Sequence, residues 1–432
     1  MEETRKTGIG TKIKQYFVDA PGTVIPTGYV GVLDGIRVFA ILTVAHFHLW
    51  QQSWLTLNFK TPALAKIGIP SISFEWIQRY GSFFVDMMIL LTGFCLFLPY
   101  ARYMIEGDAR RPGLPDRYEV RNFFIKRIAR IVPSYYFCTF FYLFVFIIPS
   151  KNYGSAADFF KDSGLMRQMF ANMTFTQTLS ADTYMMTPFN GALWTVAVEM
   201  QFYLIFPILA FLFRKKPILT YIGMVAVSFY YIRFKVIPMD DGEFRWHFNQ
   251  MPALLCVFAN GMLGALLFVS VARNLRQTRF TGIMFTLLTV ASFLAVRFVL
   301  KTGPGSTLNI RWQLDVRFML SMFFMLICVG TAFSVRWFRK LFDNKAMHFL
   351  AGISYNLYIW HQVIAVKLKV HRIPFWEGDE YPNIAGNRPW MIKYTLIAVL
   401  AAFAAAVAAT YLIEKPCAKL IGKLTGIRRK KF

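Results

Sequence analysis

The sequence predicts an all-α polytopic membrane protein with about ten transmembrane helices and both termini in the cytoplasm. Three observations predict this fold class: the composition, the recurrence of apolar runs, and the placement of Lys and Arg. Of the 432 residues, 56% are hydrophobic and 16% are charged, whereas soluble domains carry about 25% charged residues. The mean hydropathy is +0.43. This composition excludes an ordinary soluble protein.

Apolar runs of about 20 residues, the length that crosses a bilayer core, recur along the whole chain. Lipid offers no hydrogen-bond partner to the backbone, so each run should be a helix. The expected spans are 32–52, 79–99, 131–149, 192–213, 217–234, 252–270, 281–299, 314–333, 348–368 and 393–414. No stretch between them is long enough for a second core. We therefore expect a cytoplasmic N-terminal arm (1–31), one transmembrane domain (32–414) and a basic cytoplasmic tail (415–432).

The orientation follows from the bias of Lys and Arg toward cytoplasmic connections. With the N-terminus inside, 29 of these residues fall on inner segments and 12 on outer segments. A net charge of +25 would suggest nucleic acid in a soluble protein. Here the basic residues flank apolar helices, which favours contact with anionic lipid headgroups and no nucleic-acid partner. Within the outer connection 150–191, the segment 157–175 (ADFFKDSGLMRQMFANMTF) could form an amphipathic helix lying on the membrane.

Ionisable side chains within a span are costly and mark functional candidates. These candidates are Arg37, His46, His48, Asp86, Glu199, Arg317, His361 and Glu414. Counted from the outer helix ends, four of them lie in one layer roughly 6–10 Å deep: His48, Asp86, Glu199 and His361. Four different helices contribute them, which predicts a buried polar site near the outer surface.

The first span carries a second pattern. Arg37 and His48 are eleven residues apart, which places them on one helix face about 16 Å apart along the axis. This distance is similar to the reach of a pantetheine arm, so the pair could hold a thioester. His46 lies nearly opposite Arg37, and we interpret it as a packed or helix-bonded histidine. Arg127 and Arg130 share a face at i and i+3, which suits phosphate groups, although a role as topology determinants fits the pair equally well.

Six short segments, in order, carry a family resemblance. They are 33–48 (LDGIRVFAILTVAHFH), 85–94 (VDMMILLTGF), 126–136 (KRIARIVPSYY), 194–203 (WTVAVEMQFY), 354–361 (SYNLYIWH) and 413–416 (IEKP). Together they resemble the acyltransferase-3 family of membrane O-acyltransferases. The second segment departs from the family pattern at Met87, Met88 and Thr92.

The resemblance implies an acyl-CoA donor on the cytoplasmic side, most often acetyl-CoA, and a hydroxyl acceptor outside the cytoplasm, usually on a cell-surface glycan. It implies an enzyme of the cell membrane that modifies polysaccharide of the cell envelope. It also implies that His48 is essential and that Arg127 and Arg130 help to bind the donor. Arg37 is assigned to the donor by its position on the first span, below His48. Some relatives carry a further extracytoplasmic domain, which we do not expect here. Transfer would then be direct or would involve a separate extracytoplasmic partner protein.

The chemistry of His48 has two interpretations. A neutral imidazole beside a carboxylate, either Glu199 or Asp86, suits general-base catalysis. A covalent acyl-histidine that relays the group is the second. Both carboxylates could instead be structural, hydrogen-bonded across helices.

Other residues are assigned by position. His361, Trp194 and Tyr358 could line the acceptor pocket, although a satisfied core histidine fits His361 as well. Arg317 beside Asp315 is expected to form a local ion pair. No spacing of His, Cys or carboxylates predicts a metal site.

Two rival classes fit parts of the pattern. A secondary transporter with a polar site within the membrane also has about ten helices and intramembrane charges, but the two halves show no detectable symmetry. A structural membrane subunit that binds lipid through its basic faces would leave the aligned outer residues unexplained.

Overall fold

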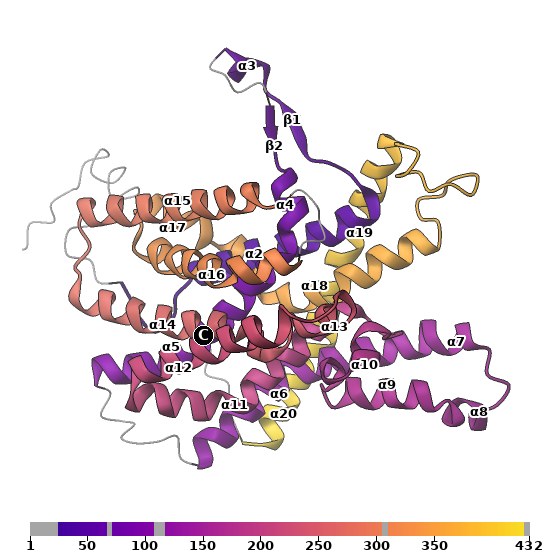
Figure 1. Ribbon diagram of the computed structural model, residues 1–432, viewed down its shortest axis with the longest axis horizontal. Helices are drawn as coiled ribbons and strands as arrows, with labels where there is room; N and C mark the ends of the chain where they lie inside the picture. Colours follow the sequence, from indigo (N-terminus) through magenta and orange to yellow (C-terminus); the bar gives the residue numbers. More distant parts are fainter. Residues whose placement is uncertain (1–24, 67–70, 108–116, 305–309, 427–432) are drawn as a thin grey trace, which may run out of the picture.

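The computed structural model describes residues 25–66, 71–107, 117–304 and 310–426, and these are almost entirely helical (Figure 1). Most of the predicted N-terminal arm, residues 1–24, lies outside the described residues. So do 108–116 of the long inner connection and 427–432 of the predicted tail.

Ten long helices carry the ten predicted spans. They are α2 (Val32–Ser53), α5 (Phe84–Glu106), α6 (Arg117–Tyr142), α11 (Trp194–Lys215), α12 (Pro217–Tyr230), α14 (Met251–Asn274), α15 (Arg279–Thr302), α16 (Ile310–Phe333), α18 (Lys345–Val370) and α19 (Arg388–Ala409). Within the described ranges, nine helical segments are both long and apolar enough to cross a membrane. The remaining predicted span, 348–368, lies in α18, whose 26 residues are sufficient in length and include polar positions that the site uses. The prediction of an all-α polytopic membrane protein is confirmed.

Short elements continue or connect these helices. Turns of π-helix, η2 (Leu143–Ile147), η5 (Tyr231–Val236) and η6 (Thr410–Glu414), extend α6, α12 and α19. The remaining elements are α3 (Pro62–Ala65), α4 (Glu75–Tyr80), η1 (Gly81–Phe83), α7 (Ile148–Lys151), α8 (Ala156–Lys161), α9 (Ser163–Met173), η3 (Gln177–Leu179), α10 (Ala181–Met185), η4 (Gly191–Leu193), α13 (Asp241–His247), α17 (Arg336–Phe342) and α20 (Lys415–Leu424).

A small antiparallel hairpin leaves the bundle after α2. Strand β1 (Asn58–Lys60) pairs with β2 (Ser71–Ser73), with Phe59 opposite Ile72. The hairpin stands away from the helices at the top of Figure 1.

The connection 150–191 forms several short helices rather than one amphipathic helix. Helix α9 begins at Ser163, and the preceding Asp162 caps it, its carboxylate accepting from the Leu165 N–H at 2.9 Å. Tyr153, that N–H and Lys151 all donate to this carboxylate and lower its pKa to about 2. The cap separates α9 from α8 because it ends one hydrogen-bond ladder and starts another.

The tightest packing in the bundle joins α5 and α14. A Cβ atom on Gly261 would lie 2.1 Å from the Leu90 carbonyl oxygen, and one on Gly93 would lie 2.5 Å from that of Phe258. Only glycine permits backbones to approach this closely, and small residues are what membrane helices use for close contact. The contact fixes α5 in the centre of the bundle.

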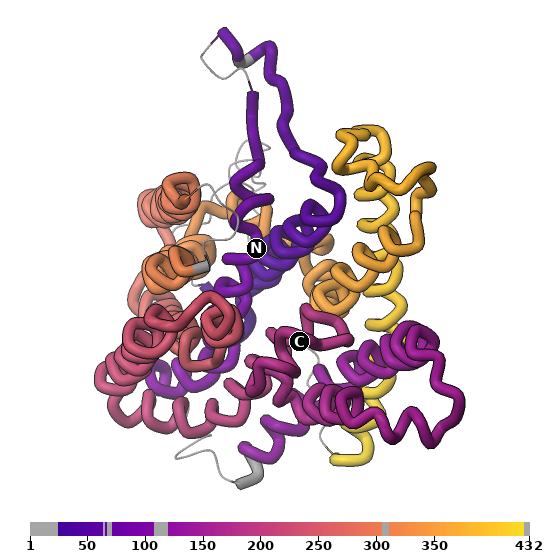
Figure 2. Tube along the Cα trace, turned by 45° about the vertical axis from the view of Figure 1, so that its right-hand side comes forward, coloured from indigo at the N-terminus to yellow at the C-terminus, as the bar shows by residue number. Residues whose placement is uncertain are grey.

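Helix α2 runs through the middle of the molecule (Figure 2), packed against α5 and α18. By contrast, α12 and α15 are peripheral and present large apolar side chains outward, among them Ile218, Leu219, Leu287 and Phe298. Such faces suit lipid. The central helices α2, α5 and α18 are therefore the ones that can hold a polar site away from lipid.

Candidate active site

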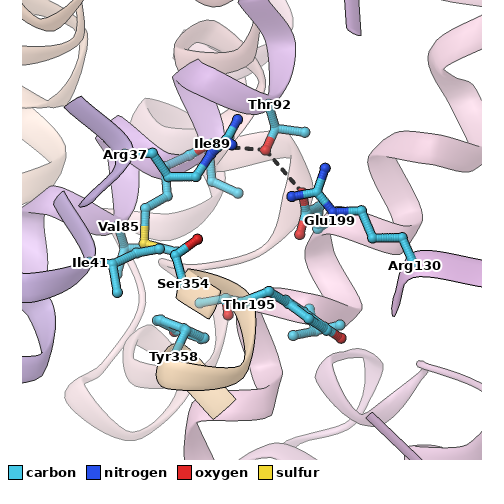
Figure 3. Close-up of a pocket in the computed structure, with 13 residues that line it drawn as sticks. Arg37, Ile41, Val85, Ile89, Thr92, Arg130, Thr195, Glu199, Ser354 and Tyr358 are labelled. Carbon is cyan, nitrogen blue, oxygen red and sulfur yellow. Dashed lines mark hydrogen bonds between the residues drawn. The ribbon is translucent and has the colours of Figure 1, made fainter. Parts of the chain in front are cut away.

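Five helices, α2, α5, α6, α11 and α18, enclose a cavity (Figure 3). It holds about 610 Å³ of space, open space at its mouth included. Its lining residues are Arg37, Ile41, Val85, Met88, Ile89, Thr92, Arg130, Thr195, Val196, Glu199, Ser354, Tyr355 and Tyr358. Five of these side chains are apolar, three are charged and five carry a hydroxyl group, so the wall combines apolar and polar surface.

Arg37 lies in the first two turns of α2. Its guanidinium is 3.5 Å from Asp34 Oδ1, one turn earlier, and its Nη2 donates to Cys95 Sγ on α5 at 3.5 Å. These contacts hold the cation at the wall of the cavity while leaving most of its donors available.

The predicted donor-binding pair of α6, Arg127 and Arg130, has two different surroundings. Arg130 lines the cavity. Arg127 lies over the Tyr203 ring at 5.6 Å and the Phe123 ring at 5.7 Å, and its buried Nε has no hydrogen-bond partner among the described residues. The predicted pair therefore shares a helix face, but only Arg130 reaches the cavity.

Glu199 is held by two hydroxyl groups. Thr92 of α5 donates to Glu199 Oε1 at 2.9 Å, and Tyr203, one turn further along α11, donates to the same oxygen at 2.6 Å. The carboxylate faces the cavity that Arg37 and Arg130 also line.

Asp86 has a different partner from the one the sequence suggested. Its carboxylate accepts from Arg317 Nε at 3.0 Å, and both side chains are buried, with exposed fractions of 4% and 0%. Arg317 Nη1 also donates to the Phe248 carbonyl at 2.8 Å. The expected local pair between Arg317 and Asp315 is therefore wrong. The reason is that Arg317 faces the bundle, where an uncompensated cation needs a buried carboxylate from another helix.

His48 contacts His361 rather than a carboxylate. His48 Nδ1 lies 2.8 Å from His361 Nε2. His361 Nδ1 lies 2.7 Å from the Tyr358 carbonyl oxygen and 3.2 Å from that of Leu357. His361 is 1% exposed, and His48 is partly exposed. The expectation that Glu199 or Asp86 orients His48 is replaced by an imidazole partner.

The predicted single layer of four residues separates into three sites. His48 and His361 meet, Glu199 faces the cavity, and Asp86 pairs with Arg317. Glu199 lies deeper than expected because the segment before α11 folds into the bundle. Asn190 donates to the Ile359 carbonyl of α18 at 2.7 Å, which places it near the level of His361. Glu199 follows nine residues later, roughly 13 Å further along a helix.

The remaining predicted site residues differ in position. Tyr358 lines the cavity with its ring centre 5.6 Å from that of His361. Trp194 packs edge-on against Tyr184 and is not one of the lining residues. The buried His46 Nε2 atom has no hydrogen-bond partner in the described part of the chain, which fits the packed interpretation of this histidine. The described residues include no group of three His, Cys, Asp or Glu side chains that could hold a metal.

Sequence reasoning did not assign Tyr203, Tyr355 or Thr195 to the site. Tyr203 follows Glu199 by four residues, and this spacing places the two on one helix face, so a signal was present. Tyr355 lines the cavity and donates to the Ile131 carbonyl at 3.0 Å. That contact joins α18 to α6, which the sequence does not place side by side.

Comparison with known proteins gives one family. The model of the acyltransferase-3 family, described as an acyltransferase domain, matches residues 30–414. The chain is 24% identical over 352 residues to a protein of Acidianus two-tailed virus provisionally named an acetyltransferase, with 81% of this chain and 87% of the viral protein covered. It is 22% identical over 350 residues to a protein of Staphylococcus aureus (strain COL) provisionally named an O-acetyltransferase. That match covers 77% of this chain and only 50% of the staphylococcal protein. No solved structure matches the protein.

Proposed function

The chain belongs to the acyltransferase-3 family of integral membrane acyltransferases, and from this premise we propose that it moves an acyl group, most simply acetyl, from cytoplasmic acyl-CoA to a hydroxyl of an extracytoplasmic acceptor. The acceptor that we propose is a cell-surface glycan, reached directly or through an extracytoplasmic partner protein. We place the enzyme in the cell membrane with both termini in the cytoplasm. The observation that carries the proposal is the position of His48 on the same helix as the cavity residues Arg37 and Ile41.

The donor would enter from the end of the cavity where the arginines lie. Arg37 and Arg130 offer planar guanidinium groups that suit phosphate oxygens. Apolar side chains such as Ile41, Val85 and Val196 form part of the wall of the same cavity, whereas His48 and His361 are not among its lining residues. An acyl-pantetheine arm is narrow and mostly uncharged, so it fits a channel of this chemistry. The thioester would then approach His48, which is seven residues, roughly 10 Å, beyond Ile41.

His48 would act as the general base. Its free ring nitrogen takes the proton of the acceptor hydroxyl as that oxygen attacks the thioester carbonyl carbon. The new C–O bond forms, the C–S bond breaks, and the leaving thiolate takes the proton to give free CoA. In the alternative relay, His48 itself attacks the thioester and the acceptor hydroxyl then receives the group from the ring.

Glu199 supports the donor site in this proposal. It lies in the wall that also holds two arginines, so its charge offsets part of theirs and its hydroxyl partners fix its direction. Asp86 is assigned to holding α5 against α16 through Arg317. Tyr358, His361 and Trp194 lie toward the acceptor side. Of these, Tyr358 is the one that lines the cavity and so can contact either substrate.

The experiment is acyl transfer by the purified protein in liposomes. Acetyl-CoA labelled in its acetyl group is supplied, and release or transfer of the label to an oligosaccharide mixture is measured. His48→Ala should lower turnover by about 10²–10⁴-fold, the usual contribution of a general base. His46→Ala is the matched control, because it removes an imidazole from the same helix two residues away and should leave turnover nearly unchanged.

Two outcomes would count against the proposal. Equal loss in both variants would point to damage to α2 rather than to chemistry at His48. No turnover by the wild type, together with uptake of a solute that His48→Ala blocks, would favour the transporter.

A further inference from the structure

We infer that His361 is the positioning residue for His48: it fixes the imidazole of His48 in the tautomer that leaves Nε2 unprotonated and ready to accept a proton. The inference rests on the proposed function for the role of that nitrogen. The hydrogen-bond assignment itself rests on geometry alone.

His361 is hydrogen-bonded to the backbone of its own helix, α18. His361 Nδ1 lies 2.7 Å from the Tyr358 carbonyl oxygen and 3.2 Å from the Leu357 carbonyl oxygen. Carbonyl oxygens only accept hydrogen bonds, so Nδ1 must carry the hydrogen. In a neutral imidazole the other nitrogen is then an acceptor. His361 Nε2 therefore presents a lone pair to whatever faces it.

The facing atom is His48 Nδ1, at 2.8 Å. A contact this short between two nitrogens needs one hydrogen between them. Since His361 Nε2 is the acceptor, His48 Nδ1 is the donor. The hydrogen of a neutral His48 is thereby committed to Nδ1, and Nε2 is left with its lone pair. This is the arrangement that a general base requires, and it is the one that a carboxylate imposes in a catalytic triad.

The two alternatives are disfavoured by the surroundings. If His361 carried its hydrogen on Nε2, its Nδ1 lone pair would face two carbonyl oxygens with no hydrogen between them. If His361 carried both hydrogens, a cation would be buried at a side chain that is 1% exposed. Its described polar contacts are two carbonyls and one imidazole, none of which compensates a charge.

The two consecutive hydrogen bonds, from His361 to the Tyr358 carbonyl and from His48 to His361, also restrain the imidazole ring of His48. Because His361 is anchored to its own helix, the hydrogen bond ties the imidazole of α2 to α18 at a defined angle, with the ring planes 30° apart. When His48 takes a proton during reaction, its Nδ1–H remains bonded to a neutral acceptor. No proton needs to move to His361. His361 therefore acts through His48 and does not touch the reacting atoms.

The test combines variants with a spectroscopic measurement that does not depend on turnover. His361→Phe keeps a ring of similar size but removes the acceptor, whereas His361→Gln restores an acceptor oxygen. Trp360→Phe is the control, since it alters the neighbouring buried side chain on α18. For each protein, thermal stability, kcat and the donor KM are measured in liposomes. The histidine tautomers are read from nitrogen-15 NMR correlations, with His48→Ala used to assign the signals.

We expect wild-type His48 to carry its hydrogen on Nδ1. In His361→Phe, kcat should fall by several-fold or more because His48 then populates both tautomers and its ring is no longer held in one orientation, with donor KM unchanged. His361→Gln should recover most of this loss, and Trp360→Phe should keep kcat and the tautomer. A wild-type His48 with its hydrogen on Nε2, or an unchanged kcat in His361→Phe, would overturn the inference. If the tautomer is as stated but the wild type transfers no acyl group, the proposed function fails while the assignment of His361 stands.

Discussion

Arg317 of α16 and Asp86 of α5 form an ion pair within the bundle, with Nε 3.0 Å from Oδ2 and almost no exposure of either side chain. The pair joins two helices that are more than 200 residues apart in the chain, and α5 also carries Thr92 and Cys95 of the cavity region. Its integrity therefore bears on the position of the site as well as on stability.

Breaking this pair should destabilise the protein strongly. Asp86→Ala leaves the Arg317 guanidinium buried and unpaired, which costs about 3–5 kcal/mol. Thermal unfolding in detergent measures the effect as a lowered midpoint. Asp182→Ala is the matched control, because it breaks an ion pair with Arg167 of similar length, 2.9 Å, that is largely exposed and contributes little. Equal shifts in the two variants would contradict the structural role of Asp86. The double variant Asp86→Leu with Arg317→Met should recover part of the loss, since both charges are removed together.

The close contact between α5 and α14 gives a second stability prediction. Gly261→Ala places a Cβ atom 2.1 Å from the Leu90 carbonyl oxygen, so the helices must separate, at a cost of about 1–3 kcal/mol or more. The same substitution at Gly223 of α12 meets no atom within 4 Å and serves as control. Unfolding midpoints should fall for the first variant and stay constant or rise for the second, because alanine favours a helix more than glycine does. A stable, fully active Gly261→Ala would show that α5 can shift without consequence.

The sequence predicts the helices of this fold well and their contacts poorly. Apolar runs report helix existence because lipid permits no other backbone structure for an isolated span. The sequence also predicts that Arg37 and His48 share one face of their helix, since this relationship depends only on the helical period. Which helices meet is decided by long-range packing such as the Gly261 contact, and this leaves no periodic signal.

The sequence predicts the depth of the ionisable residues within the membrane least well. The depth prediction assumes that every outer helix end lies at the same level, and Asn190 shows why this fails. The residue bonds to the Ile359 carbonyl inside the bundle, so α11 begins below the surface and Glu199 lies beside the arginines instead of beside His48. The partner of His48 was equally out of reach. His361 was recognised as a buried ionisable group, but only the packing of α18 against α2 brings it within 2.8 Å.

Arg130 and Arg121 of α6 should differ in their effects on donor binding. Arg130 lines the cavity, so Arg130→Ala should raise the donor KM by about tenfold or more, as expected for loss of a charge-assisted hydrogen bond to phosphate. Arg130→Lys should restore the binding in part, because a lysine keeps the charge but not the planar fork. Arg121→Ala changes an exposed cation on the same helix and should leave KM unchanged. The donor KM of each variant is measured from initial rates over a range of acetyl-CoA concentrations. Equal KM values for Arg130→Ala and Arg121→Ala would show that Arg130 does not bind the donor.

Tyr203 tests whether the direction of Glu199 matters to the arginines. Its hydroxyl donates to Glu199 Oε1 at 2.6 Å, while its ring lies 5.6 Å from the Arg127 guanidinium carbon. Tyr203→Phe removes the hydrogen bond and keeps the stacked ring, so any effect comes from the carboxylate alone. We expect a rise of a few-fold in donor KM, because a freed Glu199 can turn toward Arg37 or Arg130 and compete with phosphate for their donors.

Glu199→Gln should differ from Tyr203→Phe in that it also lowers thermal stability. It removes the charge that competes with phosphate, but it leaves the buried cations uncompensated. Tyr221→Phe is the control for loss of a buried phenol, because its hydroxyl bonds to Asn260 at 2.7 Å away from the cavity. If Tyr203→Phe leaves KM unchanged while Glu199→Gln raises it, the carboxylate acts by its charge and not by the direction that Tyr203 and Thr92 give it.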